Sequence, residues 1–166
     1  VNQWVLSPEN IDITTVKDLS GNEDGLLHGR MVPVQNPPAL YFDGTYNYIE
    51  LAGKDEAKTL PTGKLTAEAW VAVNSPAEWG GIVGCLQDNG SFEKGWVLGY
   101  NNDKFNFALS TGGDLTYLNA SVSFQTGRWY HVVGTYDGKI QRLIVDGKEV
   151  ASARGELGAI RNPLTP

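Results

Sequence analysis

A short acidic loop near the start of the chain carries the residue types that bind a hard cation. Side chains that carry oxygen occupy every second position: Asp18, Ser20, Asn22 and Asp24. This spacing lets a loop surround a calcium ion with carboxylate, amide and carbonyl oxygens at about 2.3–2.6 Å. The loop is not an EF-hand, because the twelfth position counted from Asp18 is Gly29, which has no carboxylate.

Two interpretations of this acidic loop stay open. In the first it is a calcium site, and Asp43 or Asp137 completes the coordination from elsewhere in the chain. In the second it is a turn in which acidic and amide side chains accept hydrogen bonds from their own backbone. Asp43 and Asp137 both precede glycine in turn-like segments, which explains them without a metal. The candidate calcium ligands are therefore Asp18, Asn22, Asp24 and Asp43.

Three places combine an aromatic ring with polar side chains, as sugar-binding sites do. Ring faces stack on the C–H side of a sugar, while amides and carboxylates bind its hydroxyl groups. Trp79 stands in a loop-like segment, and Tyr100 precedes a run of asparagine and aspartate. The predicted ligand-binding residues are Trp79, Tyr100, Asn102 and Tyr117. For Tyr100 and Tyr117 the alternative is that each packs across strands inside the fold.

The sequence offers no catalytic framework. His131 lies within a strand-like run, where we expect a buried, hydrogen-bonded side chain, and His28 is expected to bond to backbone. Retaining glycosidases need two carboxyl groups about 5–5.5 Å apart, and no two acids stand two positions apart within a predicted strand. Glu68 is expected to face the interior and to pair with a residue such as Arg128. Nucleophile elbows, phosphate loops and zinc spacings do not occur, so we predict a protein that is not an enzyme.

Turn residues divide the chain into short strands. Asp137-Gly138 and Asp146-Gly147 each stand between apolar runs, and Asp-Gly supplies the positive φ angles that two-residue hairpin turns need. Strands are expected over 39–43, 46–51, 64–74, 80–87, 95–100, 103–110, 114–122, 128–137, 140–145 and 148–153. One helical turn is expected over 55–60. The tryptophans inside strand-like runs are predicted to be core residues: Trp70, Trp96 and Trp129.

Four segments in chain order resemble the laminin G-like, concanavalin A-like jelly-roll family. They are DLSGNEDG at 18–25, LYFDGTYNYIEL at 40–51, LTAEAWV at 65–71, and WYHVVGTYDG at 129–138 with LIVDG after it. The resemblance implies an all-β fold, a two-sheet antiparallel β-sandwich of concanavalin A-like jelly-roll type. It also implies calcium binding by Asp18 and its neighbours, and an extracellular recognition role.

Composition narrows the classes of partner. The chain has 166 residues, of which 41% are hydrophobic, so it can build a packed core. Its net charge of −6 argues against a nucleic-acid surface, and the lack of a run of 18 apolar residues argues against membrane insertion. Cys85 is the single cysteine, expected to be a small buried side chain.

These observations lead to one functional prediction and its alternatives. Residues 158–164 resemble the approach to the family's last strand, so we expect a single domain over 1–166 that lacks this strand and belongs to a larger polypeptide. The predicted function is a non-catalytic extracellular or cell-surface module that binds a glycan or an extracellular protein, assisted by calcium. The alternative is a purely structural accessory domain that packs against a neighbouring catalytic domain. An unusual hydrolase is a third interpretation.

Overall fold

The computed structural model describes residues 1–21, 23–51, 60–90, 92–154 and 158–163. These residues form antiparallel strands and one 3₁₀ turn over Pro8–Asn10, which confirms the all-β prediction. The helical turn predicted over 55–60 falls, except for its last residue, outside the described residues. In the part of the chain that the structure describes, no helix is long and apolar enough to cross a membrane.

The chain divides into two compact units, 1–57 and 58–166. In the N-terminal unit, β1 (Thr15–Val16), β2 (Gly25–His28) and β5 (Tyr48–Glu50) form an antiparallel sheet in the order β1-β2-β5. A second hairpin joins β3 (Val32–Gln35) to β4 (Pro38–Tyr41). The sequence did not predict β1, β2 or β3, because all three are short and β3 contains a proline, which is unfavourable inside strands.

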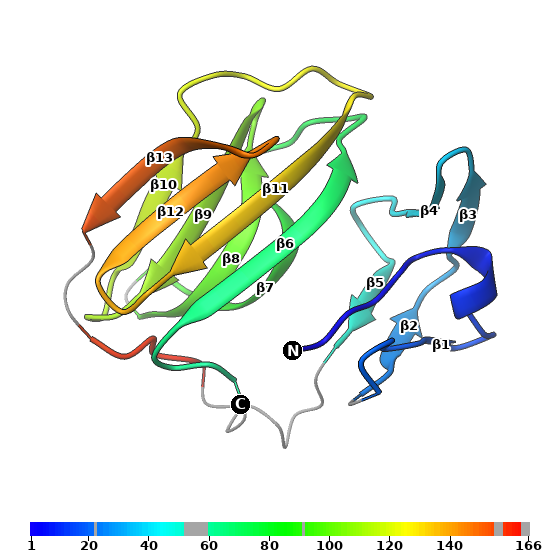
Figure 1. The fold of residues 1–166 in the computed structure, drawn as a ribbon, viewed down its shortest axis with the longest axis horizontal. Coiled ribbons are helices and arrows are strands. Elements are labelled where there is room, and N and C mark those ends of the chain that lie inside the picture. The colour runs from blue at the N-terminus through cyan, green and yellow to red at the C-terminus, as the bar shows by residue number, and fades with distance from the viewer. Residues whose placement is uncertain (22, 52–59, 91, 155–157, 164–166) are drawn as a thin grey trace. The chain divides into compact units, whose positions relative to one another are not determined.

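The C-terminal unit is built from two antiparallel four-stranded sheets (Figure 1). The β8 sheet has the order β10-β9-β8-β7, and the β11 sheet has the order β13-β12-β11-β6. The strands of the β8 sheet are β7 (Gly80–Asp88), β8 (Glu93–Asn101), β9 (Lys104–Ser110) and β10 (Leu115–Asn119). Those of the β11 sheet are β6 (Leu65–Ala72), β11 (Trp129–Tyr136), β12 (Ile140–Val145) and β13 (Lys148–Arg154). Every strand predicted from residue 39 onward is present.

The predicted Asp-Gly turns shape the β11 sheet. The two-residue turn predicted at Asp146-Gly147 is present between β12 and β13, with φ angles of 49° and 76°. The turn between β11 and β12 has three residues, 137–139, rather than the two predicted, and only Gly138 of the Asp-Gly pair has a positive φ, of 92°. Backbone in this left-handed region suits tight hairpins and strongly favours glycine at its most strained positions. The three strands therefore form the antiparallel meander that the sequence predicts.

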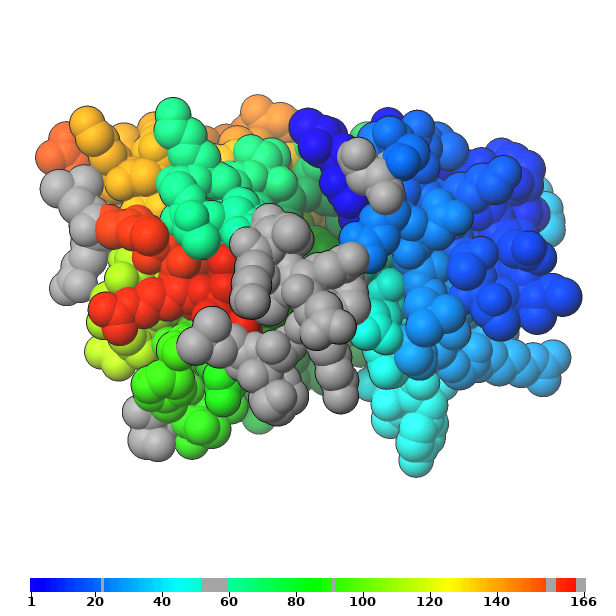
Figure 2. Space-filling model, turned by 90° about the horizontal axis from the view of Figure 1, so that it is seen from below, coloured from blue at the N-terminus to red at the C-terminus, as the bar shows by residue number. Residues whose placement is uncertain are grey.

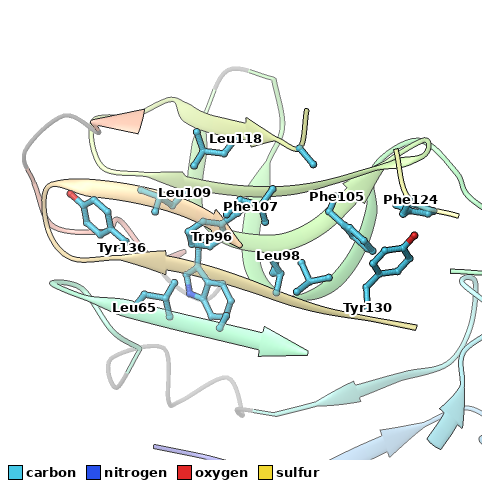
Figure 3. Close-up of a cluster of buried hydrophobic side chains, with 14 of the residues drawn as sticks. Leu65, Trp96, Leu98, Phe105, Phe107, Leu109, Leu118, Phe124, Tyr130 and Tyr136 are labelled. Carbon is cyan, nitrogen blue, oxygen red and sulfur yellow. The ribbon is translucent and has the colours of Figure 1, made fainter. Parts of the chain in front are cut away.

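The hydrophobic core lies between the two sheets (Figure 3). Strand alternation turns Leu98 of β8 and Phe107 of β9 toward the β11 sheet, where Val132 and Leu143 meet them, all almost completely buried. Gly134 allows close packing at this interface, because a Cβ atom there would lie 2.5 Å from the Phe107 ring. The two inner faces thus form the sandwich that the sequence predicts.

The C-terminal segment 158–163 closes one end of the sandwich. Ile160 is buried, and its N–H donates to Thr62 O at 2.6 Å. Arg161 N–H donates to Ser110 O at 2.9 Å, while Gly95 N–H donates to Arg161 O. Figure 2 shows this segment in red, against residues of both sheets. The segment therefore links the ends of β8 and β9 to the stretch that leads into β6.

Two of the three tryptophans predicted to lie in the core are on the surface. Trp96 is buried as predicted, but Trp70 is 68% exposed and Trp129 is partly exposed. In β6 the buried positions are Leu65 and Ala67, so alternation turns Trp70 outward. The prediction was wrong because it considered the apolar run and not its phase. Cys85, predicted to be buried, is half-buried.

The same alternation overturns the prediction for Glu68. This residue shares the outward phase of Trp70, and its side chain is exposed rather than turned to the interior. Arg128 forms its ion pair with Asp146 instead, with 3.1 Å between Nη2 and Oδ2. Glu68 therefore belongs to the outer face of the β11 sheet.

Candidate ligand-binding pocket

A pocket of about 180 Å³ opens on the outer face of the β8 sheet, with residues from all four strands in its lining. The inner face is defined by the cross-strand row of Leu98, Phe107 and Leu118. The next row of cross-strand partners, one residue along each strand, consists of Val97, Ala108 and Tyr117. Because side chains alternate between the two faces of a sheet, this row points away from the core. The pocket is therefore positioned by the register of the sheet.

Trp79, the residue before β7, forms one wall of the pocket. Its side chain is 62% exposed, and its ring meets the Tyr117 ring edge to face, with 5.3 Å between centroids and 61° between planes. Its φ of 57° is unusual for a bulky residue, and such backbone strain concentrates at functional sites. At the next residue, Gly80, a Cβ atom would lie 2.1 Å from Tyr100 Cζ. Only glycine therefore fits between these two aromatic residues.

Carboxylates give one side of the pocket a negative charge. Asp88 ends β7, and its Oδ2 accepts a long hydrogen bond of 3.5 Å from Tyr117 Oη. Glu93 stands opposite Asp88 in the β7–β8 ladder, and its carboxylate accepts a hydrogen bond from Leu115 N–H. Burial raises the pKa of Tyr117, and the charges of Asp88 and Glu93 raise it further. Both carboxylates therefore act electrostatically on the Tyr117 side chain.

Asn106 of β9 contributes an amide group to the lining. The residue is only 3% exposed, yet its side chain makes no hydrogen bond within the described residues. Buried polar groups in proteins nearly always have a partner, so an amide in this position has capacity for a ligand or for water. Gly99 keeps the space beside it open, because a Cβ atom there would lie 3.3 Å from Asn106 Oδ1.

The structure brings together three of the four residues predicted to bind a ligand. Trp79, Tyr100 and Tyr117 line one pocket. Tyr100 also meets the predicted packing alternative, because its ring contacts Phe124 edge to face at 5.9 Å. Asn102 does not line the pocket. It forms the β8–β9 turn with a φ of 53°, and its N–H donates to Ala77 O at 3.0 Å, which anchors the segment before Trp79.

The two polar residues of the lining, Asp88 and Asn106, were not among the predicted ligand-binding residues. Asp88 stands in an Asp-Asn-Gly sequence, which is typical of a turn. The alternation of Phe105 and Phe107 was a usable signal, because it turns Asn106 to the face opposite the core. What the sequence could not indicate is that Trp79 and Tyr117 meet over this face.

The acidic loop of the N-terminal unit bonds to its own chain. Asp18 is 5% exposed, and its Oδ1 accepts hydrogen bonds from Gln3 N (2.8 Å), Ser20 N (2.9 Å) and Ser20 Oγ (2.6 Å). Its Oδ2 accepts one from Glu23 N at 3.2 Å, and Asp18 N–H donates to Asp24 Oδ1 at 2.9 Å. Burial acts to raise the pKa of Asp18, but these hydrogen bonds outweigh it and hold the pKa well below its usual range.

Among the predicted calcium ligands, Asp24 lies beside Asp18, but Asp43 does not join these two in a group that could hold a metal. Asp43 Oδ1 accepts hydrogen bonds from Thr45 N and Tyr46 N, which lower the pKa of Asp43 and cap its own turn. Asn22 lies outside the described residues. Among those described, no group of three or more His, Cys, Asp or Glu side chains is placed to hold a metal. Calcium binding stays a prediction. The hydrogen bonds that the turn interpretation predicts, from backbone N–H groups to acidic side chains, are present at Asp18 and Asp43.

Both histidines form pairs with carboxylates. His131 stacks on Trp70 across the β6–β11 ladder at 5.1 Å, and its Nε2 lies 3.4 Å from Glu68 Oε2. His28 Nε2 lies 2.8 Å from Glu50 Oε2 in the β2–β5 ladder, not on a backbone partner as predicted. His131 is on the outer face of its sheet rather than in the core, because it is the cross-strand partner of Trp70, which points outward.

A family model described as the concanavalin A-like lectin/glucanases superfamily, of the laminin G type, matches residues 43–165. This range is most of the chain, and the observed sandwich has the expected architecture. The protein therefore belongs to this superfamily, as its sequence motifs indicate.

Two curated relatives are pappalysin-1 from Mus musculus, 30% identical over 145 residues, and pappalysin-1 from Homo sapiens, 31% identical over 145 residues. Each match covers 78% of this chain but only 9% of the relative. A solved structure of an S-layer domain-containing protein from Clostridium thermocellum aligns with a TM-score of 0.54 at 22% identity, over 92% of this chain and 71% of that one. That likeness shows the fold alone.

Proposed function

We propose that the protein is a non-catalytic recognition module of an extracellular or cell-surface polypeptide, and that it binds its ligand in the Trp79–Tyr117 pocket. The observation that carries the proposal is the convergence of three aromatic rings, a carboxylate and the amide of Asn106 in the lining of one cavity. Apolar walls with a few convergent polar groups are the usual composition of a ligand site. The family membership and the similarity to pappalysin-1 support an extracellular setting.

The ligand of this module is a glycan or an extracellular protein. The pocket volume of about 180 Å³ is smaller than the roughly 300–1,000 Å³ of sites for drug-sized molecules. The pocket therefore suits one sugar ring or one side chain of a larger partner. In a longer polypeptide such a module raises the local concentration of the partner near the other domains.

The composition of the pocket supports binding without hydrolysis. Asp88 is the one acidic residue in its lining, within the described part of the chain. Retaining glycosidases need two carboxyl groups that both face the scissile bond. The neighbouring Glu93 carboxylate is engaged by Leu115 N–H.

An accessory structural role is the second candidate function, and Trp70 is the observation that favours it. Trp70, His131 and Glu68 form a contiguous group on the outer face of the β11 sheet, and a 68% exposed tryptophan is a large apolar surface. A neighbouring domain that packs on this face would bury it. This role does not conflict with ligand binding on the β8 sheet.

The test is a glycan array and a peptide array probed with the full chain and two matched variants. Trp79→Ala removes the exposed tryptophan of the pocket, and Trp70→Ala removes the exposed tryptophan of the other sheet. We expect ligands bound by the wild type to be lost in Trp79→Ala and retained in Trp70→Ala. Ligands that Trp79→Ala still binds with wild-type affinity would disprove the assignment of the pocket.

A further inference from the structure

We propose that the pocket accepts the cationic end of a lysine side chain from a protein partner, with the ammonium group held beside the corner of the Trp79 and Tyr117 rings and near the Asp88 carboxylate. This inference rests on the proposed function and narrows its ligand from glycan or protein to a basic segment of a protein. Three properties of the described pocket carry it: its charge, its ring geometry and its apolar walls.

The charge of the pocket is negative and uncompensated. Asp88 is the one charged residue in the described lining, with no lysine or arginine beside it. Glu93 stands opposite Asp88 on the neighbouring strand. The nearest lysine along β8, Lys94, has the opposite strand phase and lies over the Phe92 ring at 4.4 Å. A cation therefore gains attraction here that a neutral sugar does not, and an anion is repelled.

The two aromatic rings form a corner. Trp79 and Tyr117 are inclined by 61° with centroids 5.3 Å apart. Cations are attracted to ring faces within about 6 Å of the centroid, most strongly to tryptophan. Two differently oriented rings beside one carboxylate can enclose a small cation from several sides.

The remaining walls suit an aliphatic chain. Leu86 and Val97 supply apolar side chains, and Gly80 and Gly81 expose backbone without side chains. Lysine buries its methylene stem on such surfaces while its ammonium group stays with polar partners. The amide of Asn106 is only 3% exposed and offers an acceptor oxygen for an N–H donor. The volume of about 180 Å³ admits one side chain.

The experiment compares two tripeptides that differ in one charge, acetyl-Gly-Lys-Gly-amide and the same peptide with an acetylated lysine Nζ. Each is titrated into the ¹⁵N-labelled full chain, and the Trp79 indole and Gly81 amide signals are followed by NMR. We expect the charged peptide to shift these signals with at least about tenfold higher affinity than the acetylated one. Methyl glucoside and glucosamine, titrated in parallel, separate a peptide source from a sugar source.

Two variants that should leave the fold intact test whether the charge of Asp88 and the site of binding are as proposed. Asp88→Asn keeps one acceptor oxygen for Gly90 N–H and places an amide nitrogen, which can donate to Tyr117 Oη, where the second oxygen was. The charge is removed, so we expect the variant to bind the charged peptide about fivefold or more weakly and to bind the acetylated peptide as the wild type does. Trp70→Ala should have no effect on either. Added salt should weaken the charged peptide only.

The outcomes separate the inference from the proposed function. Equal affinity of the two peptides, or no effect of Asp88→Asn, overturns the lysine assignment. Stronger binding of either sugar than of the charged peptide, lost in Trp79→Ala, also overturns it while the proposed pocket stands. If none of the four probes moves the Trp79 and Gly81 signals, and array ligands bind Trp79→Ala normally, both proposals fail.

Discussion

The acidic loop around Asp18 and the pocket beside Asp88 use the same kind of residue in opposite ways. Asp18 is buried and accepts four hydrogen bonds from its own chain, close to the acceptor capacity of a carboxylate. Asp88 is exposed beside a pocket and accepts one bond from Gly90 N–H and a long one from Tyr117 Oη. A run of acidic residues in a sequence is therefore weak evidence for a binding site. Stronger evidence is a carboxylate that still has hydrogen-bond acceptor sites available in the folded protein.

If the pocket and not the acidic loop binds the ligand, Trp79→Ala should cause the largest loss of affinity. A central aromatic contact in a small site is worth about 2 kcal/mol or more, so affinity for an array ligand should fall about 30-fold. Isothermal titration calorimetry measures the loss, with Trp70→Ala as the control. If Asp18→Asn weakened binding as much as Trp79→Ala, the distinction between the two regions would not hold.

Gly80→Ala should damage the pocket through packing. The added Cβ atom would meet the Tyr100 ring at 2.1 Å, and overpacking of this kind costs about 1–3 kcal/mol. Urea unfolding gives the change in the free energy of unfolding. Gly81→Ala is the matched control, because no atom lies within 4 Å of its added Cβ, and it should leave stability nearly unchanged. Equal stability of the two variants would contradict the packing around Tyr100.

Asp18→Asn should change how stability depends on pH. The folded pKa of Asp18 lies below its unfolded value of about 3.9, so its stabilisation is present above about pH 4 and is lost as pH falls toward the folded pKa. Thermal unfolding from pH 7 to pH 2 should show a smaller fall in Tm for the variant, which starts from a lower Tm at pH 7. Part of the fall remains, because the pKa values of Asp43 and Asp137 are also lowered. Identical pH profiles would contradict the assigned hydrogen bonds.

Calcium should have the smallest effect. The Asp18 oxygens are already engaged by donors of the chain, so we expect Tm in millimolar calcium and in excess chelator to agree within about 1 °C. An ion at 100 times its dissociation constant adds about 2.7 kcal/mol and would raise Tm by several degrees. A shift of that size, abolished in Asp18→Asn, would support the calcium interpretation and make the acidic loop a binding site like the pocket beside Asp88.

Local chemistry made much of the fold predictable. Asp146-Gly147 predicts a hairpin turn because few residue pairs adopt two consecutive positive φ angles, and the turn is present. The alternation of Phe105 and Phe107 predicts which face of β9 is buried. The same alternation in β6, where Leu65 and Ala67 are buried, places Trp70 and Glu68 on the outer face.

The amino-acid sequence predicts the sandwich, its hairpin turns and three aromatic residues of the pocket, Trp79, Tyr100 and Tyr117. These depend on strand alternation and turn conformation, which are properties of neighbouring residues. Only the tertiary structure decided that Trp79 and Tyr117 form one corner, and that Asp88 and Asn106 complete it. The reason is physical: cross-strand register sets which side chains meet, and register is fixed by the packing of the whole sheet and not by any single segment.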